Sequence, residues 1–204
     1  MILLQPTYFS PIIQYVAIAQ CKQLAFEVED NFQKQTYRNR CYIYTATGKH
    51  ILNVPIKHAK EIKQKTKDVK IDYKDYWNKL HLKTLKTAYN SSPFFEYYID
   101  DLLPIFEKQT TFLLDLNLKC HYFIMDALQI EIPIIKTTAY HKDVNSLDLR
   151  NLAIAKGTTN FQLERYIQVF EEQKGFISNL SILDLLFMEG PNALNYLESQ
   201  KVQF

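Results

Sequence analysis

The chain opens with Ile2-Leu3-Leu4-Gln5-Pro6-Thr7-Tyr8-Phe9-Ser10-Pro11-Ile12-Ile13, and this stretch decides the fold. The apolar run that Gln5-Pro6 ends predicts a short buried strand. Pro11 then begins a segment with helical spacing of its apolar residues, which are Ile12, Ile13, Val16, Ala17 and Ala19. Strand, loop and helix in this order favour an α/β domain.

Further strands are predicted on both sides of a polar stretch in the first third. Residues 24–28 resemble a second strand, and residues 41–45 and 51–56, joined by the glycine-containing segment 46–49, predict a hairpin. Residues 69–72 are a candidate for one more strand after a lysine-rich loop over 57–74. Later, residues 132–136 have the β-branched density of a buried strand, with Pro133 at its start or edge.

Helices are predicted from Tyr76 onward, where the apolar period changes to 3.6. The segments are 76–89, 94–106 and 110–128, and the remainder is expected to be mainly helical. Ser181 is placed to cap a helix that Gly190 ends, and Pro191 to open the last helix. The expected fold is a single α/β domain over residues 1–204, with a mixed sheet formed mainly by the N-terminal third and helices from the middle and C-terminal parts packed on it.

Composition excludes several classes of protein. With 204 residues, 47% of them hydrophobic, and a net charge of only +2, the chain has no global basic field for nucleic acid. Three widely separated cysteines suit a reducing compartment, and neither a signal peptide nor a membrane-spanning run is evident, so a cytoplasmic location is expected. No metal-ligand spacing, dinucleotide motif, phosphate-binding loop or nucleophile elbow is present, and the sequence does not identify a cofactor.

The segment Gln33-Lys34-Gln35-Thr36-Tyr37-Arg38-Asn39-Arg40 is the strongest functional signal. Arg38 and Arg40 are two residues apart, so on an extended chain they project from the same face, and guanidinium groups suit carboxylate or phosphate. The segment therefore predicts an anion-binding loop. The alternative is a solvated turn whose arginines pair with the upstream acids Glu27, Glu29 or Asp30.

Other candidate residues each have a structural alternative. Gln5 and Tyr8 follow the first strand, where α/β sheets bind ligands, but such loops often only pack. His81 lies on the apolar face of its helix and is either a general base or a core imidazole. Asn117 falls in an apolar stripe and needs partners for its amide. Ser181 and Asp184 form either a helix cap or a catalytic pair.

Tyrosines alternate with cations over residues 37–44, a pattern that can stack nucleic-acid bases. Because the overall charge is near neutral, we consider nucleic acid an unlikely partner. An anionic small molecule such as a nucleotide or nucleotide-sugar is favoured instead.

Several motifs resemble the WbqC-like protein family across nearly the whole chain. The specific ones are the segment 33–40 and Asn179-Leu180-Ser181-Ile182-Leu183-Asp184-Leu185-Leu186-Phe187, supported by Gln5-Pro6-Thr7-Tyr8-Phe9, Trp77-Asn78-Lys79-Leu80-His81 and Asp115-Leu116-Asn117. Leu4 departs from the family where many members have histidine, and Ser10 where proline is common. A role that rests on that histidine cannot apply to this chain.

The resemblance implies a bacterial cytoplasmic protein of O-antigen or other surface-polysaccharide synthesis. It implies modification of amino-sugars or transfer of small acyl or aminoacyl groups, with His81 and Asp184 as catalytic candidates. Its ligand-binding candidates are Gln5, Tyr8, Gln33, Lys34, Arg38, Asn39, Arg40, Asn117 and Ser181. The alternative is a non-enzymatic ligand-binding or assembly protein of the same pathway. In either case Arg38 and Arg40 are expected to share a concavity with His81.

Overall fold

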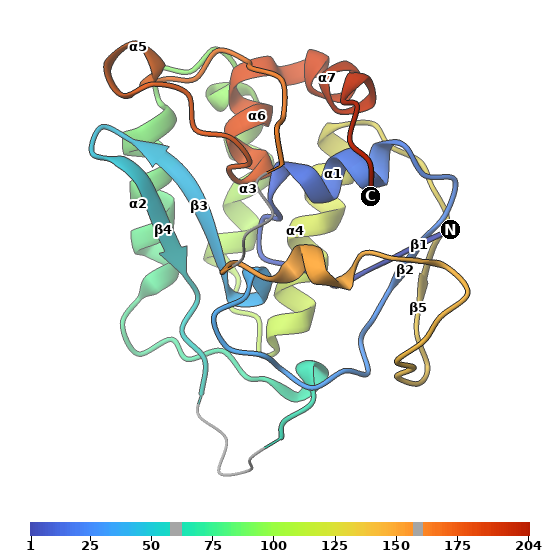
Figure 1. Ribbon diagram of the computed structural model, residues 1–204. Coiled ribbons are helices and arrows are strands. Elements are labelled where there is room, and N and C mark those ends of the chain that lie inside the picture. Colours follow the sequence, from blue (N-terminus) through green and yellow to red (C-terminus); the bar gives the residue numbers. More distant parts are fainter. Residues whose placement is uncertain (58–62, 157–160) are drawn as a thin grey trace.

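The computed structural model describes residues 1–57, 63–156 and 161–204, and its architecture is mixed α/β (Figure 1). A parallel sheet has the strand order β5-β2-β1-β6, formed by Ile134–Lys136, Leu24–Phe26, Ile2–Leu4 and Leu147–Asp148. Helix α1 (Ile12–Ala19) connects β1 to β2. The opening stretch therefore folds as its sequence predicts. Both β1 and β2 are buried.

The order of the strands creates a switch point in the sheet. From β1, the chain adds β2 and then β5 on one side, and afterwards adds β6 on the other side of β1. Parallel register pairs Ile2 with Leu24 on one side and with Leu147 on the other. In open parallel sheets, ligands bind beyond the carboxyl ends of the strands where the order reverses. Here that place lies between the residues that follow β1 and those that follow β6.

Strand β5 differs from the expected buried strand. It lies at the edge of the sheet, Ile135 is exposed, and Pro133 directly precedes it, where its missing N–H removes no interior hydrogen bond. Two of the four strands thus come from residues 134–148, which complete the sheet begun by the N-terminal third.

The predicted hairpin consists of β3 (Arg40–Thr45) and β4 (Gly48–Asn53), a separate antiparallel pair beside α2 in Figure 1. Its connection is shorter than expected, because only Ala46 and Thr47 lie between the strands. Residues 69–72 form only isolated bridges, such as Ile56 with Ile71. The middle of the lysine-rich connection, residues 58–62, lies outside the described residues.

Three helices form the middle of the molecule, as predicted: α2 (Trp77–Tyr89), α3 (Phe95–Glu107) and α4 (Leu113–Ala127). The core is one cluster that includes residues from the sheet, the hairpin and these helices. His81 and Asn117 lie inside it, as their positions in the apolar stripes predict.

The C-terminal part is less helical than expected. After the 3-10 helix η3 (Arg150–Ala153), helix α5 (Glu171–Lys174) has only four residues, and residues 161–168 have no regular secondary structure. Helices α6 (Ile182–Glu189) and α7 (Ala193–Ser199) follow, joined by η4 (Gly190–Asn192). Gly190 ends α6 with a positive φ of 50°, and a Cβ there would lie 2.5 Å from the Phe94 ring. Only glycine fits this position.

Candidate functional site

A pocket of about 520 Å³ lies at the switch point of the sheet. Its lining comes from the segments that follow three neighbouring strands: Gln5 after β1, Glu29 and Asp30 after β2, and Arg150 and Asn151 after β6. The other polar residues of its lining are Asn31, Gln33, Lys65 and Tyr140. This sheet-edge pocket has the position that open parallel sheets use for ligands.

Arg38 supports the wall of this pocket from inside the protein. Its side chain is 1% exposed, and the guanidinium donates to Asp30 Oδ2 over 2.5 Å and to Thr36 Oγ1 over 3.2 Å. Gln5 Nε2 donates to the same Asp30 oxygen over 2.7 Å. The expectation that Arg38 faces a ligand freely is therefore wrong, and the ion-pairing alternative describes its placement.

The second oxygen of Asp30 is available for a further interaction. Asp30 Oδ1 and Arg38 Nε are both buried, and neither has a hydrogen-bond partner within the described residues. A buried carboxylate oxygen without a donor costs free energy unless a ligand or water supplies one. Because Asp30 also lines the pocket, it is the best-placed acceptor for a ligand hydroxyl or amino group.

Asn117 holds this arrangement together from α4. Its Nδ2 donates to Pro6 O over 3.1 Å and to Arg38 O over 2.9 Å, so one amide joins the loop after β1 to the segment 33–40. Tyr8 N–H donates to Tyr37 O and adds a second link. Asn117 is completely buried and therefore positions the loops.

The segment 33–40 also lines a second pocket of about 370 Å³. Residues 37–39 form the 3-10 helix η1 (Tyr37–Asn39), and Arg40 begins β3, so Arg38 and Arg40 do not share a face as expected for an extended chain. Arg38 points inward, whereas Lys34, Asn39 and Arg40 line this hairpin-base pocket. Neither Lys34 nor Arg40 forms an ion pair with any described residue. The segment thus offers two unpaired cations.

Asn39 fixes the floor of the hairpin-base pocket. Its Nδ2 donates to Val54 O over 3.1 Å and to Asn53 Oδ1 over 3.3 Å, while its own Oδ1 is buried without a partner among the described residues. Asn39 O in turn accepts from Val54 N–H. These contacts join η1 to the end of β4 and so help to position Arg40, which directly follows Asn39.

Arg150 also lines the sheet-edge pocket. The sequence did not single out this basic residue. It donates to both oxygens of Asp148, at 2.9 and 2.6 Å, and to the carbonyl oxygens of His141 and Lys142. Glu27 Oε2 lies 3.5 Å from the same guanidinium. Hydrogen bonding to Asp148 raises the pKa of Arg150 and lowers that of Asp148. Arg150 therefore holds β6 and its loop in place.

His81 and Tyr8 form a buried pair that lines neither pocket. His81 Nδ1 and the Tyr8 hydroxyl are 3.0 Å apart, and both side chains are enclosed by the core. Burial lowers the pKa of His81 to about 4, partly opposed by a hydrogen bond to the backbone of Asn53. The imidazole is neutral near pH 7 and lines neither of the two pockets. This placement matches the core alternative, and the expected concavity shared with the arginines is absent from the described residues.

Asp184 and Ser181 also lie in the interior. Asp184 accepts hydrogen bonds from the hydroxyls of Tyr89 and Tyr166 at 2.6 and 2.7 Å, with Gln168 Nε2 at 3.4 Å. Burial raises the pKa of Asp184 to about 6 against the effect of these donors. The carboxylate of Asp184 does not cap the start of α6, because its two oxygens accept from the tyrosine hydroxyls.

Ser181 has the capping role that the sequence predicts. Its Oγ accepts from Leu183 N–H over 3.3 Å and donates to Phe9 O over 2.8 Å. The contact with Leu183 caps α6, and the contact with Phe9 joins the start of α6 to the loop after β1. Ser181 therefore positions elements, and it lines neither pocket.

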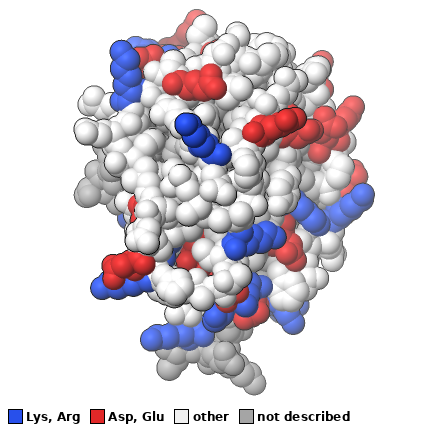
Figure 2. Space-filling model, turned by 90° about the vertical axis from the view of Figure 1, so that its right-hand side faces the viewer, with Lys and Arg blue, Asp and Glu red and all other residues white. Residues whose placement is uncertain are grey.

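Neither a charged patch on the face in Figure 2 nor a metal-binding cluster among the described residues indicates another binding centre. On the face in Figure 2, basic and acidic side chains are interspersed in the lower part and the middle is largely uncharged. Among the described residues, no group of three or more histidine, cysteine, aspartate or glutamate side chains could hold a metal ion. No described helix is both long and apolar enough to cross a membrane.

The structure therefore divides the predicted site residues into two groups. Gln5 and Gln33 line the sheet-edge pocket, and Lys34, Asn39 and Arg40 line the hairpin-base pocket. The buried group supports them and consists of Tyr8, Arg38, His81, Asn117, Ser181 and Asp184. The sequence pointed to Asp30 only as a pairing partner, although its position just after β2 follows the same rule that selected Gln5.

Comparison with known proteins identifies the family of the chain. The family described as "WbqC-like protein family" matches residues 5–169. A Mycobacterium tuberculosis protein described as "Uncharacterized protein Rv1507c" is 29% identical over 201 residues, which cover 84% of this chain and 87% of that protein. No solved structure matches the chain.

Proposed function

The chain belongs to the WbqC-like protein family, and from that premise we propose that it binds an amino-sugar carrying an anionic group, such as a nucleotide-linked amino-sugar. The proposed setting is the cytoplasmic synthesis of a bacterial surface polysaccharide such as O-antigen. The observation that supports binding is the pair of pockets served by the single segment 33–40, one at the sheet switch point and one with unpaired cations.

The two pockets have complementary chemistry for such a ligand. The sheet-edge pocket offers Asp30 Oδ1, which has no donor among the described residues, together with the amides of Gln5 and Gln33. These groups suit the hydroxyl and amino groups of a sugar. Lys34 and Arg40 in the hairpin-base pocket suit a phosphate or carboxylate, because charge-assisted hydrogen bonds from arginine are strong and directional. The sugar would therefore occupy the first pocket and the anion the second.

Transfer of a small acyl or aminoacyl group is the first candidate activity. The nitrogen of the sugar amine would form a bond to the carbonyl carbon of an activated donor, and the bond from that carbon to the leaving group would break. The leaving group would depart with its electron pair and take up the proton that the nitrogen loses. In this step Asp30 would orient the amine. Non-enzymatic binding is the second candidate, and the enclosed positions of His81 and Asp184 favour it, because neither can reach a ligand in the two pockets.

A thermal-shift screen against nucleotide-sugars, coenzyme A thioesters and amino acids tests the proposal, since a ligand that binds the native state raises Tm. We expect a nucleotide-linked amino-sugar to give the largest shift, and Arg40→Ala to reduce that shift. Mass spectrometry of the sugar after incubation with the donor then separates the two candidates. A new acylated product supports transfer, whereas binding without product supports the non-enzymatic role. Absence of a shift with any anionic sugar would contradict the proposal itself.

A further inference from the structure

Two side chains with extensive apolar surface line the sheet-edge pocket. Tyr140 is 52% exposed and Ile154 is 49% exposed. The other described residues of the lining all have a charged or an amide side chain. Exposed apolar surface in a pocket that also contains Asp30 Oδ1, a buried oxygen without a donor among the described residues, indicates a ligand with both an apolar and a polar side.

The Arg150 guanidinium supports the ring of Tyr140. Its central carbon lies over the ring, 5.1 Å from the ring centroid. Arg150 also donates to the carbonyl oxygens of His141 and Lys142, over 2.8 and 2.9 Å, and so holds the backbone that follows Tyr140. Because Asp148 fixes the guanidinium in turn, the ring keeps its orientation without a ligand. One face of the ring is covered by Arg150, so the exposed part of the side chain includes the opposite face.

The position of Tyr140 follows from the topology of the sheet. Tyr140 lies in the segment after β5, and Thr137, which directly follows that strand, donates its N–H to Phe26 O over 2.9 Å. The sheet-edge pocket therefore takes lining residues from the segments after all four parallel strands. Carboxyl ends of parallel strands meet at one edge of a sheet, which brings Tyr140 to the same pocket as Asp30.

A pyranose ring has the two kinds of surface that this lining offers. Its hydroxyl and amino groups project from the edge of the ring, and C–H groups cover its faces. Asp30 Oδ1 and the amides of Gln5 and Gln33 suit the edge. The Tyr140 ring suits a face, because the negative face of an aromatic ring attracts C–H groups and the contact buries apolar area. An acyclic amine would satisfy the polar groups but has no flat face for Tyr140.

We propose that Tyr140 is a specificity-determining residue of the sheet-edge pocket, and that a pyranose ring stacks against its open face. An amino or hydroxyl group at the edge of the same ring donates to Asp30. This inference rests on the proposed function and deepens it, because it defines the sugar as a closed six-membered ring that the protein recognises by one face.

Calorimetric titration with UDP-glucosamine and with UDP tests the proposal. UDP keeps the anionic group and lacks the sugar, so the difference between the two affinities measures the contribution of the sugar. We expect the wild type to bind UDP-glucosamine more tightly than UDP. Tyr140→Leu keeps apolar bulk and removes the ring, and it should weaken binding of UDP-glucosamine about threefold to tenfold while leaving that of UDP unchanged.

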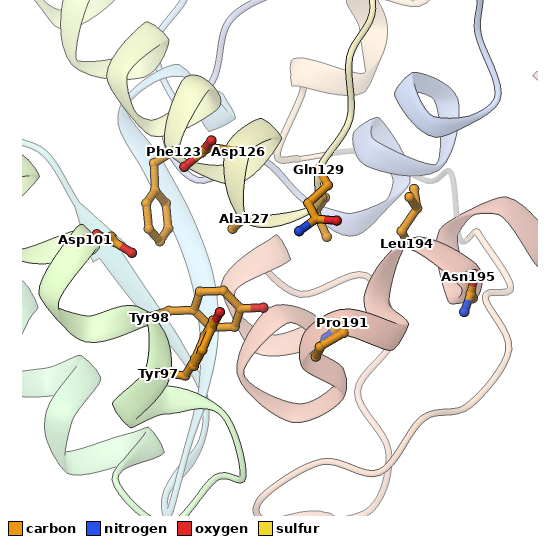
Figure 3. Close-up of a pocket in the computed structure, with 11 residues that line it drawn as sticks. Tyr97, Tyr98, Asp101, Phe123, Asp126, Ala127, Gln129, Pro191, Leu194 and Asn195 are labelled. Atoms are coloured by element: carbon orange, nitrogen blue, oxygen red, sulfur yellow. The ribbon is translucent and has the colours of Figure 1, made fainter.

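Two further variants serve as controls. Tyr140→Phe keeps the ring and should bind UDP-glucosamine like the wild type. Tyr97→Leu removes a tyrosine that is 74% exposed and lines the pocket in Figure 3, not the sheet-edge pocket, and it should bind both compounds like the wild type. Because Tyr140 is exposed, Tyr140→Leu should also leave the Tm without ligand nearly unchanged.

Proton NMR spectra of UDP-glucosamine give a direct signature of stacking. Protons that lie over an aromatic ring are shifted upfield, so the C–H signals of the glucosamine ring should move upfield with the wild type and with Tyr140→Phe. With Tyr140→Leu this shift should be lost. A residue that only stabilised the pocket would leave no such signature.

The outcomes separate this inference from the proposed function. If the wild type binds neither compound, both fail. If it binds UDP-glucosamine but Tyr140→Leu has the same affinity, or if Tyr140→Leu weakens UDP and UDP-glucosamine equally, only the role of Tyr140 is overturned. Equal affinity of the wild type for the two compounds would also overturn it, because the sugar would then make no contact of its own.

Discussion

Asp30 and Asp184 are both almost fully buried carboxylates, yet their surroundings differ in kind. One oxygen of Asp30 accepts hydrogen bonds from the Arg38 guanidinium and the Gln5 amide. Its other oxygen has no donor among the described residues. Asp184 has only neutral donors, from Tyr89, Tyr166 and Gln168. Asp30 lines the sheet-edge pocket, whereas Asp184 ties α6 to its neighbours. Burial alone therefore does not distinguish a carboxylate that can bind a ligand from one that only stabilises the fold. An oxygen without a donor, on a residue that lines a pocket, makes that distinction.

The largest expected effect comes from removing the cation beside Asp30. Arg38→Ala leaves a buried carboxylate without its partner, which typically costs about 3–5 kcal/mol of stability. Urea unfolding monitored by circular dichroism measures this loss. The control is Arg40→Ala, because Arg40 lies in the same segment without an ion pair to a described residue and should cost less than about 1 kcal/mol. Equal losses in the two variants would remove the distinction between the buried and the available arginine.

The next effect concerns the neutral network. Asp184→Ala leaves two tyrosine hydroxyls and one amide without their acceptor, and we expect a loss of about 2–4 kcal/mol. Differential scanning calorimetry at pH 7 measures it. Asp184→Asn keeps an acceptor oxygen and should be milder than Asp184→Ala. If the alanine variant were as stable as the wild type, the network would not hold α6 in place.

Titration of the buried groups gives a pH signature. His121 is a second buried histidine and lies on α4. Burial lowers the pKa of His81 and that of His121 to about 4 in the folded protein, against about 6.5 in an unfolded chain. Between these values the unfolded state binds more protons, so stability is full above pH 6.5 and falls as the pH falls toward 4. Each histidine can contribute on the order of 3 kcal/mol to this fall.

Asp184 acts in the opposite direction. Its folded pKa of about 6 exceeds the unfolded value near 3.9, so stability falls as the pH rises from 4 to 6, on the order of 3 kcal/mol in total. Two histidines outweigh one aspartate, and the net result is acid destabilisation below pH 6.5. Unfolding measured from pH 4 to 7 checks this sign. In Asp184→Asn the acid loss should become steeper, and an unchanged profile would contradict the raised pKa.

The smallest expected effect is on ligand binding at the pocket edges. Arg40→Ala should weaken binding of a nucleotide-linked amino-sugar by about 1.5–3 kcal/mol, the worth of a hydrogen bond to a charged group. Calorimetry with the ligand from the screen measures the change. Lys79→Ala, which removes an exposed lysine from α2 that lines neither of the two pockets, is the control and should bind like the wild type. A similar loss in both would point to a general charge effect.

Much of the fold follows from the sequence, because local patterns carry it. The run of Ile2 to Leu4 and the helical spacing after Pro11 predict β1 and α1, and the apolar stripe that contains Asn117 predicts its burial in α4. Strand β6 has two residues, and its place beside β1 depends on a contact between distant segments. No local pattern indicates such a strand.

The site was harder to predict than the fold, for the same reason. The sequence marks the polar segment 33–40 as a candidate anion-binding loop, but it does not show that η1 places Arg38 in the interior while Arg40 lines the hairpin-base pocket. The pairing of Arg38 with Asp30 was one of two alternatives that composition left open. The pocket in Figure 3 combines residues of α3, α4, η4 and α7, which are distant in the chain, so no sequence motif indicates it.

The central claim is that a ligand occupies the sheet-edge pocket at the switch point of the sheet. The most direct measurement is calorimetric titration of the best nucleotide-linked amino-sugar with the wild type and with Gln33→Ala. Gln33 is exposed, lines this pocket and makes no side-chain hydrogen bond to a described residue, so its loss should leave stability unchanged. We predict an unchanged Tm without ligand and an affinity reduced about threefold to tenfold, the loss of one hydrogen bond. Equal affinity of the two proteins would contradict the claim.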